Sequence, residues 1–156
     1  MVADNLDVFV ESIDNYFKVT CISPAKVGTP FLTTDADKYI EDYTGMIQIS
    51  GDYRGAVFFT APERMLMRIL RDLGLVSTQE NRLMDLVGEI SNILSGNARK
   101  VFGEKFSVMP PRAFHGGRSG APHADVNKIF IIPIEWNELT ANLIVNLDHH
   151  NGQLAA

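Results

Sequence analysis

The sequence predicts an α+β fold, a two-layer domain with a mainly antiparallel sheet and a long amphipathic helix pair. Helical and strand patterns alternate along the chain, and the connections between strands are too short for the crossover helices of a parallel sheet. With 156 residues, 46% of them hydrophobic, the chain can bury the core of one globular domain. We therefore expect a single domain over residues 1–156, with an N-terminal helix at 4–20, a core at 21–148 and a short tail at 149–156.

The N-terminal segment has the apolar spacing of an amphipathic helix. Its buried face is defined by residues that recur at i, i+3 and i+4, namely Leu6, Phe9, Val10, Ile13, Tyr16 and Phe17. Residues 21–42 are interrupted by prolines, glycines and a polar run, so they predict one weak strand and a loop.

Two hairpins are predicted, one on each side of the helix pair. Residues 45–49 and 56–59 are joined by a turn-like segment with glycine at both ends, and residues 128–136 and 139–147 are joined by the short Asn137-Glu138. Pro133 would remove a donor from the strand ladder, so we expect its strand at an edge or with a bulge. The second hairpin echoes the first, which is compatible with an internal pseudo-symmetry.

The helix pair lies between the two hairpins. Residues 60–63 and 77–80 resemble capping boxes and so predict two helix starts. Gly74 can stop the first helix, and the second runs to about Phe102, followed by Gly103.

The second helix of this pair carries a polar stripe. At roughly 100° per residue, one face collects Asp85, Glu89, Asn92 and Gly96, with Arg99 at its edge. The opposite face collects the apolar residues Leu83, Leu86, Val87, Ile90, Ile93, Leu94 and Val101. Solvation alone would place polar residues on an outer face. However, Gly88 and Gly96 share the outward side, and glycine inside a helix costs about 1 kcal/mol relative to alanine. Either another molecule approaches closely there, or the glycines serve packing within the domain.

Several classes of function are disfavoured by the composition. The net charge of −5 argues against non-specific nucleic-acid binding, which needs a basic face. A single cysteine, Cys21, fits a reducing compartment. The acidic N-terminal segment does not resemble a secretory signal, and the apolar run at 129–134 is far shorter than the ~20 residues that span a bilayer. We therefore expect a cytoplasmic protein with no membrane or nucleic-acid partner.

Motifs for metal or nucleophile chemistry are weak. His115 and His123 lie in a predicted loop at 112–123, without partners at the spacing of a zinc site. The segment 117–120 matches neither a nucleophile elbow nor a P-loop. A metal hydrolase that uses Asp85 and Glu89 as ligands remains an open alternative, because a carboxylate pair can hold a cation.

The order Asp85, Glu89, Asn92 resembles the signature of the CheC/CheX/FliY phosphatases of bacterial chemotaxis, which share a CheC-like fold. Residues 45–57 resemble the strand-turn-strand of that family, and the order of elements over about 20–148 is similar. The resemblance is closer to CheX than to CheC, because CheC-like proteins carry the Glu-x-x-Asn signature on two helices and this chain has it once.

The resemblance implies a protein aspartyl-phosphate phosphatase that acts on a phosphorylated CheY-like response regulator of two-component signalling. In this family the regulator carries the Mg²⁺ and a lysine, so no metal or cofactor is expected on this chain. Asn92 would hold the attacking water and Glu89 would pair with that lysine. Asp85, Gly88 and Gly96 would contact the partner.

Two further expectations come from the resemblance. CheX-like proteins form homodimers through strands, and the apolar C-terminal strands would allow a homodimer here. A non-catalytic module that binds a response regulator or belongs to a flagellar switch is the alternative function on the same fold.

Overall fold

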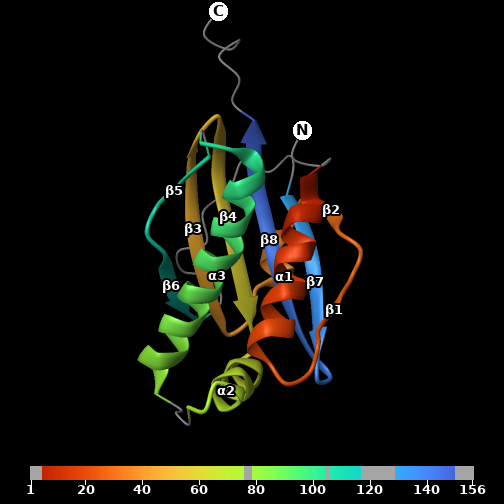
Figure 1. The fold of residues 1–156 in the computed structure, drawn as a ribbon, viewed down its shortest axis with the longest axis vertical. Coiled ribbons are helices and arrows are strands. Elements are labelled where there is room, and N and C mark those ends of the chain that lie inside the picture. The colour runs from red at the N-terminus through yellow and green to blue at the C-terminus, as the bar shows by residue number, and fades with distance from the viewer. Residues whose placement is uncertain (1–4, 76–78, 105, 117–128, 150–156) are drawn as a thin grey trace, which may run out of the picture.

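The computed structural model describes residues 5–75, 79–104, 106–116 and 129–149. Within these residues three α-helices and eight strands, with a 3₁₀ turn at residues 36–39, follow each other along the chain (Figure 1). In order they are α1 (Leu6–Thr20), β1 (Lys26–Val27), β2 (Phe31–Thr33), η2 (Ala36–Tyr39), β3 (Tyr43–Gly51), β4 (Tyr53–Ala61), α2 (Glu63–Asp72), α3 (Glu80–Phe102), β5 (Phe106–Val108), β6 (Arg112–His115), β7 (Ile129–Trp136) and β8 (Leu139–His149).

The strands form one antiparallel sheet in the order β1-β7-β8-β4-β3-β5, with β2 also pairing with β7 and β6 with β3. Helices α1 and α3 lie side by side across one face of this sheet, and α2 lies at the end where α3 begins (Figure 1). The two-layer α+β prediction is confirmed. The expected N-terminal helix is present from Leu6, whereas most of the tail lies outside the described residues.

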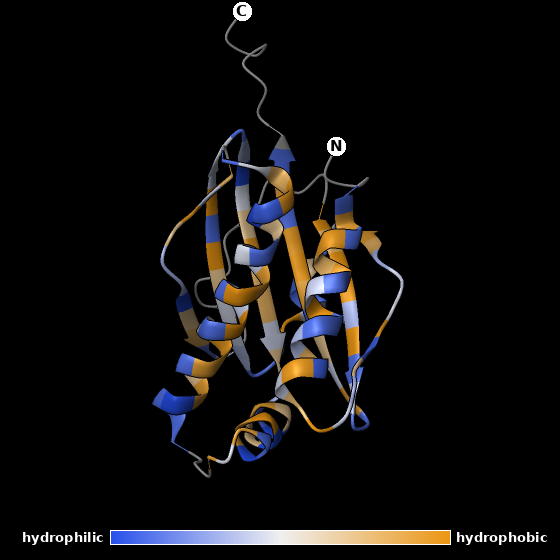
Figure 2. Ribbon diagram, in the orientation of Figure 1, coloured by the Kyte–Doolittle hydropathy of each residue, from blue (hydrophilic) through white to orange (hydrophobic). Residues whose placement is uncertain are grey.

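The main core lies between the helices and the sheet. Figure 2 shows orange apolar segments alternating with blue hydrophilic ones along α1 and α3, as expected for helices with one buried face. On α3 the core side chains are Leu83, Val87, Ile90 and Leu94, and all four are buried. A smaller apolar cluster, with Met46, Phe58, Ile131 and Ile144, lies on the other face of the sheet beside the segment that contains η2.

Helix α3 sits directly on β3 because Gly45 has no side chain. A Cβ at Gly45 would lie 2.1 Å from the Val87 carbonyl oxygen and 2.4 Å from Ser91 Oγ. The Ser91 hydroxyl donates to that same carbonyl at 2.9 Å. Close approach of the two backbones therefore fixes the middle of α3 against the sheet.

Both predicted hairpins are confirmed. In the first, β3 and β4 pair with Ile47 opposite Val57. In the second, β7 and β8 pair up to Trp136 opposite Leu139. The two loop residues between them, Asn137 and Glu138, have φ values of 49° and 66°, the left-handed geometry that suits a two-residue turn between twisted strands.

The strand with Pro133 is not an edge strand as expected, because β1 and β2 cover its outer side. Residues 134–135 pair with β1 and residues 129–131 pair with β2, so the proline falls in the gap between them. Its missing N–H needs no partner there, and its carbonyl accepts the Gly28 N–H at 2.8 Å.

Residues 21–42 therefore hold two short strands and a 3₁₀ turn, where one weak strand and a loop were predicted. The covering strands also leave the apolar C-terminal strands little open edge, since β8 lies between β4 and β7. Two copies of the chain therefore have little open edge through which those strands could pair, and the homodimer stays a prediction.

The first capping box was wrong, although α2 starts within the predicted segment at Glu63. The second box includes residues outside the described part of the chain, so it stays a prediction, and α3 starts at its last residue, Glu80. The side chain of Thr60 belongs to β4, where it bonds to Thr44 Oγ1 at 2.9 Å. The first turn of α2 is capped from elsewhere, since the Glu63 N–H donates to Asp42 Oδ2 at 2.8 Å. No side chain caps α3 at Gln79, and residues 77 and 78 lie outside the described part of the chain. None of the helices in that part is long and apolar enough to cross a membrane.

Candidate active site

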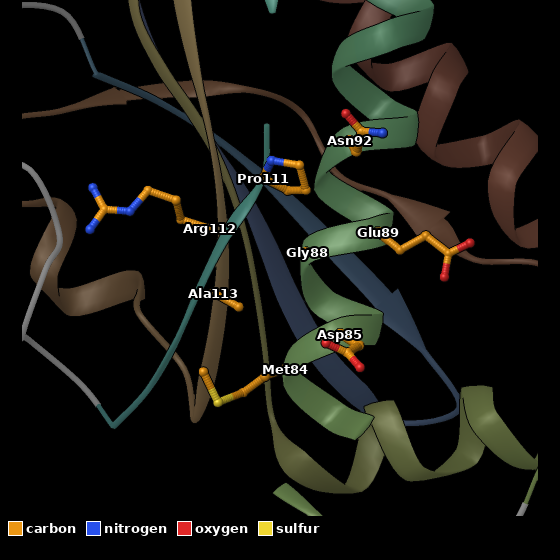
Figure 3. Close-up of a pocket in the computed structure, with 8 residues that line it drawn as sticks. All are labelled: Met84, Asp85, Gly88, Glu89, Asn92, Pro111, Arg112 and Ala113. Atoms are coloured by element: carbon orange, nitrogen blue, oxygen red, sulfur yellow. The ribbon is translucent and has the colours of Figure 1, made fainter. Parts of the chain in front are cut away.

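The polar stripe predicted on α3 is present. Asp85, Glu89 and Asn92 are all exposed on successive turns of the helix, and Figure 3 shows them pointing away from the sheet. The apolar residues beneath them anchor the helix to the core. Two members of the predicted buried face are wrong, because Ile93 is 37% exposed at the border of the stripe and Val101 is 59% exposed in the last turn.

An open groove of about 440 Å³ runs between α3 and β6 (Figure 3). Its lining comes from both elements and consists of Met84, Asp85, Gly88, Glu89, Asn92, Pro111, Arg112 and Ala113. The polar stripe thus forms one rim of the groove. The opposite side is formed by the apolar Pro111 and Ala113 and by the cationic Arg112.

The two stripe glycines have different surroundings. Gly88 is buried and faces β6, where an added Cβ would lie 3.7 Å from Pro111 Cβ and 4.0 Å from Ala113 Cβ. Its outward placement in the sequence analysis was therefore wrong, and packing within the domain accounts for part of its role. Gly96 is open, with nothing within 4 Å of an added Cβ.

The β6 side of the groove was missed by the sequence analysis, which assigned residues 112–115 to a loop. Four residues after two prolines are too few to show a period-two pattern, so no local signal marks this strand. It is defined by pairing with β3, where Met46 lies opposite Arg112 and Tyr43 opposite His115. The rest of the predicted loop, 117–123, lies outside the described residues.

His115 connects β6 to the first turn of α3. Its Nδ1 lies 2.5 Å from Glu80 Oε1, and its ring stacks on Tyr43 with centroids 4.2 Å apart. Burial raises the pKa of Tyr43, with further contributions from the carboxylates of Glu63, Glu80 and Asp42. His115 thus holds the two sides of the groove together at one end.

Glu89 points toward α1 (Figure 3). Its negative charge contributes to the raised pKa of Tyr16 on that helix. Burial is the largest cause that raises the pKa of Tyr16, followed by Cys21 and then Glu89. The Asn92 side chain makes no hydrogen bond to another of the described residues, so both ends of its amide are open to a water or a partner. Among the residues that the structure describes, no third carboxylate, histidine or cysteine joins Asp85 and Glu89 to complete a metal site.

The family model described as chemotaxis phosphatase CheX matches residues 43–135, more than half of the chain. Among solved structures, a CheC-like protein from Shewanella sp. PV-4 is 25% identical, with a TM-score of 0.81 over 95% of this chain and 99% of that one. CheX from Vibrio vulnificus is 23% identical, with a TM-score of 0.80 over 92% and 98% of the two chains.

CheX in a complex with CheY, BeF3 and Mg²⁺ from Borrelia burgdorferi is 14% identical, with a TM-score of 0.76 over 91% of this chain and 96% of that chain. At that identity the likeness shows the fold alone. A curated protein described as a leucine–tRNA ligase from Herpetosiphon aurantiacus is 33% identical over 97 residues, or 59% of this chain. The match covers 11% of that ligase, so the chain spans about a tenth of this relative's length. On the family match, supported by the shared fold, this chain belongs to the CheX family of chemotaxis phosphatases.

Proposed function

We propose that this chain hydrolyses the acyl phosphate on the phosphorylated aspartate of a CheY-like response regulator. The observation that carries the proposal is the exposed pair Glu89 and Asn92, less than one turn apart on α3 at the rim of an open groove. Family membership supports the substrate class, and the Borrelia burgdorferi structure contains a CheX bound to a CheY.

Asn92 is the proposed catalytic residue. Phosphoryl transfer asks little covalent chemistry of a protein and depends on an in-line nucleophile and on neutralised charge. An amide can accept a hydrogen bond from a water and donate another at the same time, without titrating. The Asn92 side chain can therefore orient the attacking water in line with the phosphorus.

Glu89 is the proposed docking residue, and it would pair with the active-site lysine of the regulator. Removing one partner of such an interfacial pair typically costs ~2–5 kcal/mol. Asp85, one turn back, would help to orient the partner, because a carboxylate base beside an anionic phosphate would repel its substrate. The metal that neutralises the phosphoryl charge, Mg²⁺, would belong to the regulator, and this chain would bind no cofactor of its own.

Asn92→Ala tests the catalytic assignment. We expect loss of dephosphorylation by ~10²–10³, the scale seen when one preorganised transition-state group is removed. Binding to a regulator that carries beryllium fluoride and Mg²⁺ in place of the phosphoryl group should stay nearly unchanged. Asn15→Ala is the matched control, because Asn15 is an exposed asparagine on α1.

Full turnover in Asn92→Ala would contradict the catalytic role. If the wild-type chain bound the regulator but did not accelerate the loss of its phosphate, the non-catalytic binding module would be the better description. Decay of the phosphorylated regulator, with and without each variant, is the measurement.

A further inference from the structure

Helix α2 presents a row of arginines to solvent. Arg64, Arg68 and Arg71 stand at i, i+4 and i+7, and all three are exposed. The other side of the helix is buried in the core through Met65, Leu66, Ile69 and Leu70. We call these three residues the arginine row.

Helix stability does not explain the arginine row. Like charges at i, i+3 and i, i+4 spacing destabilise a helix, and a cation in the first turn, as at Arg64, opposes the helix dipole. Only Arg71, in the last turn, interacts favourably with the dipole. None of the described residues offers a carboxylate within 4 Å of these guanidinium groups. The exposed pair Lys18 and Asp14 on α1, 2.8 Å apart, shows the opposite-charge spacing that a solvated helix gains from.

The helix that carries the row packs against α3, the helix of the candidate active site. Helix α2 packs at the end of the molecule where α3 begins, and Figure 3 shows α2 below the turn that carries Asp85. A partner that covers the stripe on α3 therefore comes close to α2.

The charges of the polar stripe and of the whole chain give the arginine row a possible function. The stripe carries Asp85 and Glu89, and the chain has a net charge of −5. Glu89 would be attracted to the regulator's lysine, whereas Asp85 and the negative charge of the rest of the chain would repel the phosphoryl charge that Mg²⁺ and the lysine leave uncompensated. At physiological salt such forces decay over about 8 Å, so they act once the partner is close to the surface. Positive charge at the edge of the site would offset the repulsion during approach.

We propose that the arginine row is a docking surface for the phosphorylated regulator, which it attracts toward α3. This inference rests on the proposed function. A protein partner fits better than a bilayer, because the apolar side of α2 is already buried and cannot insert. Arginine is enriched at protein interfaces, and Leu73 and Leu75, 45% and 42% exposed just after α2, add apolar contact area beside it.

The test neutralises the row with Arg64→Gln, Arg68→Gln and Arg71→Gln in one variant. Its matched control replaces three exposed basic residues that lie outside the helices, Lys26, Lys38 and Arg54, also by glutamine. Both variants lose the same net charge. The probe is a purified CheY-like regulator phosphorylated by a small-molecule phosphodonor, and the measurements are kcat and KM at low and high salt.

We expect the row variant to lose roughly 10-fold or more in kcat/KM at low salt, the scale of electrostatic steering, while kcat is retained. The loss should shrink at high salt, and the control should stay near the wild type. Equal kcat/KM in the row variant and the control at low salt would overturn the proposal. So would loss of binding to phosphatidylserine–phosphatidylcholine vesicles with unchanged kcat/KM, which would assign the row to a membrane.

If the proposed phosphatase function itself is wrong, the experiment gives a different result. In that case the wild-type chain itself would neither bind the regulator nor accelerate the loss of its phosphate, and both proposals would fall together. An active wild type with an unaffected row variant removes only the docking surface.

Discussion

Replacing the two stripe glycines by alanine separates stability from partner contact. In the free protein both positions accept a Cβ, because nothing lies within 4 Å at Gly96 and the nearest atom at Gly88 is at an ordinary 3.7 Å. Each alanine should add about 1 kcal/mol of helix stability. At Gly88 the buried methyl group should add up to ~0.8 kcal/mol more. For a chain of this size, each kcal/mol raises Tm by about 2–4 °C.

The same variants should act against partner binding if α3 docks closely. A methyl group forced into a well-packed contact typically costs ~1–3 kcal/mol. That range corresponds to about a 5-fold to 150-fold loss of kcat/KM toward the regulator. Gly96→Ala tests this most directly, because its new methyl group faces open solvent in the free chain.

Thermal unfolding and regulator dephosphorylation are measured on each glycine variant. A lower Tm in Gly88→Ala would show that the space beside Pro111 does not accept the methyl group. Higher Tm with unchanged kcat/KM in both variants would refute the reasoning that these glycines leave room for a partner.

Two further predictions concern the scaffold. Gly45→Ala should destabilise the fold by roughly 1–3 kcal/mol or more, because its Cβ would lie 2.1 Å from the Val87 carbonyl oxygen and would push α3 off the sheet; urea unfolding with an unchanged midpoint would contradict this. Glu41 has a pKa raised by burial and by the charge of Asp42, so its ionised form weakens the folded state at neutral pH. Glu41→Gln should therefore raise stability at pH 7, and the gain should shrink as the pH falls below the raised pKa and vanish below the ordinary pKa of a glutamate; an equal gain at neutral and at acidic pH would argue against this origin.

The elements that could be predicted from the sequence are those with a long local pattern. The 23-residue α3 and the two hairpins have apolar periodicity or a two-residue turn that needs no knowledge of their neighbours. The stripe of Asp85, Glu89 and Asn92 followed from helix geometry alone. The roles proposed for these residues came from the family resemblance, because the pattern alone fits a solvated helix face equally well.

The elements that could not be predicted depend on distant partners. Strands β1 and β2 exist because they pair with β7 on either side of Pro133, more than 95 residues later in the chain. The groove depends on β6, which only its pairing with β3 identifies. The cap of α2 comes from Asp42, across the β3–β4 hairpin, so local capping rules named the wrong side chain.

The proposed catalytic residue is positioned by the sheet, although its side chain is exposed. Asn92 follows Ser91, whose hydroxyl bonds to the Val87 carbonyl, and that carbonyl lies directly over Gly45 of β3. The backbone that carries Asn92 therefore cannot shift along or away from the sheet without breaking this contact. A group that must hold a water in line gains most from such a rigid support, because small misplacements of a positioning group are costly in rate. Docking of the proposed regulator would therefore be accommodated mainly by the side chains of the stripe and by the partner, while the backbone of α3 stays in place.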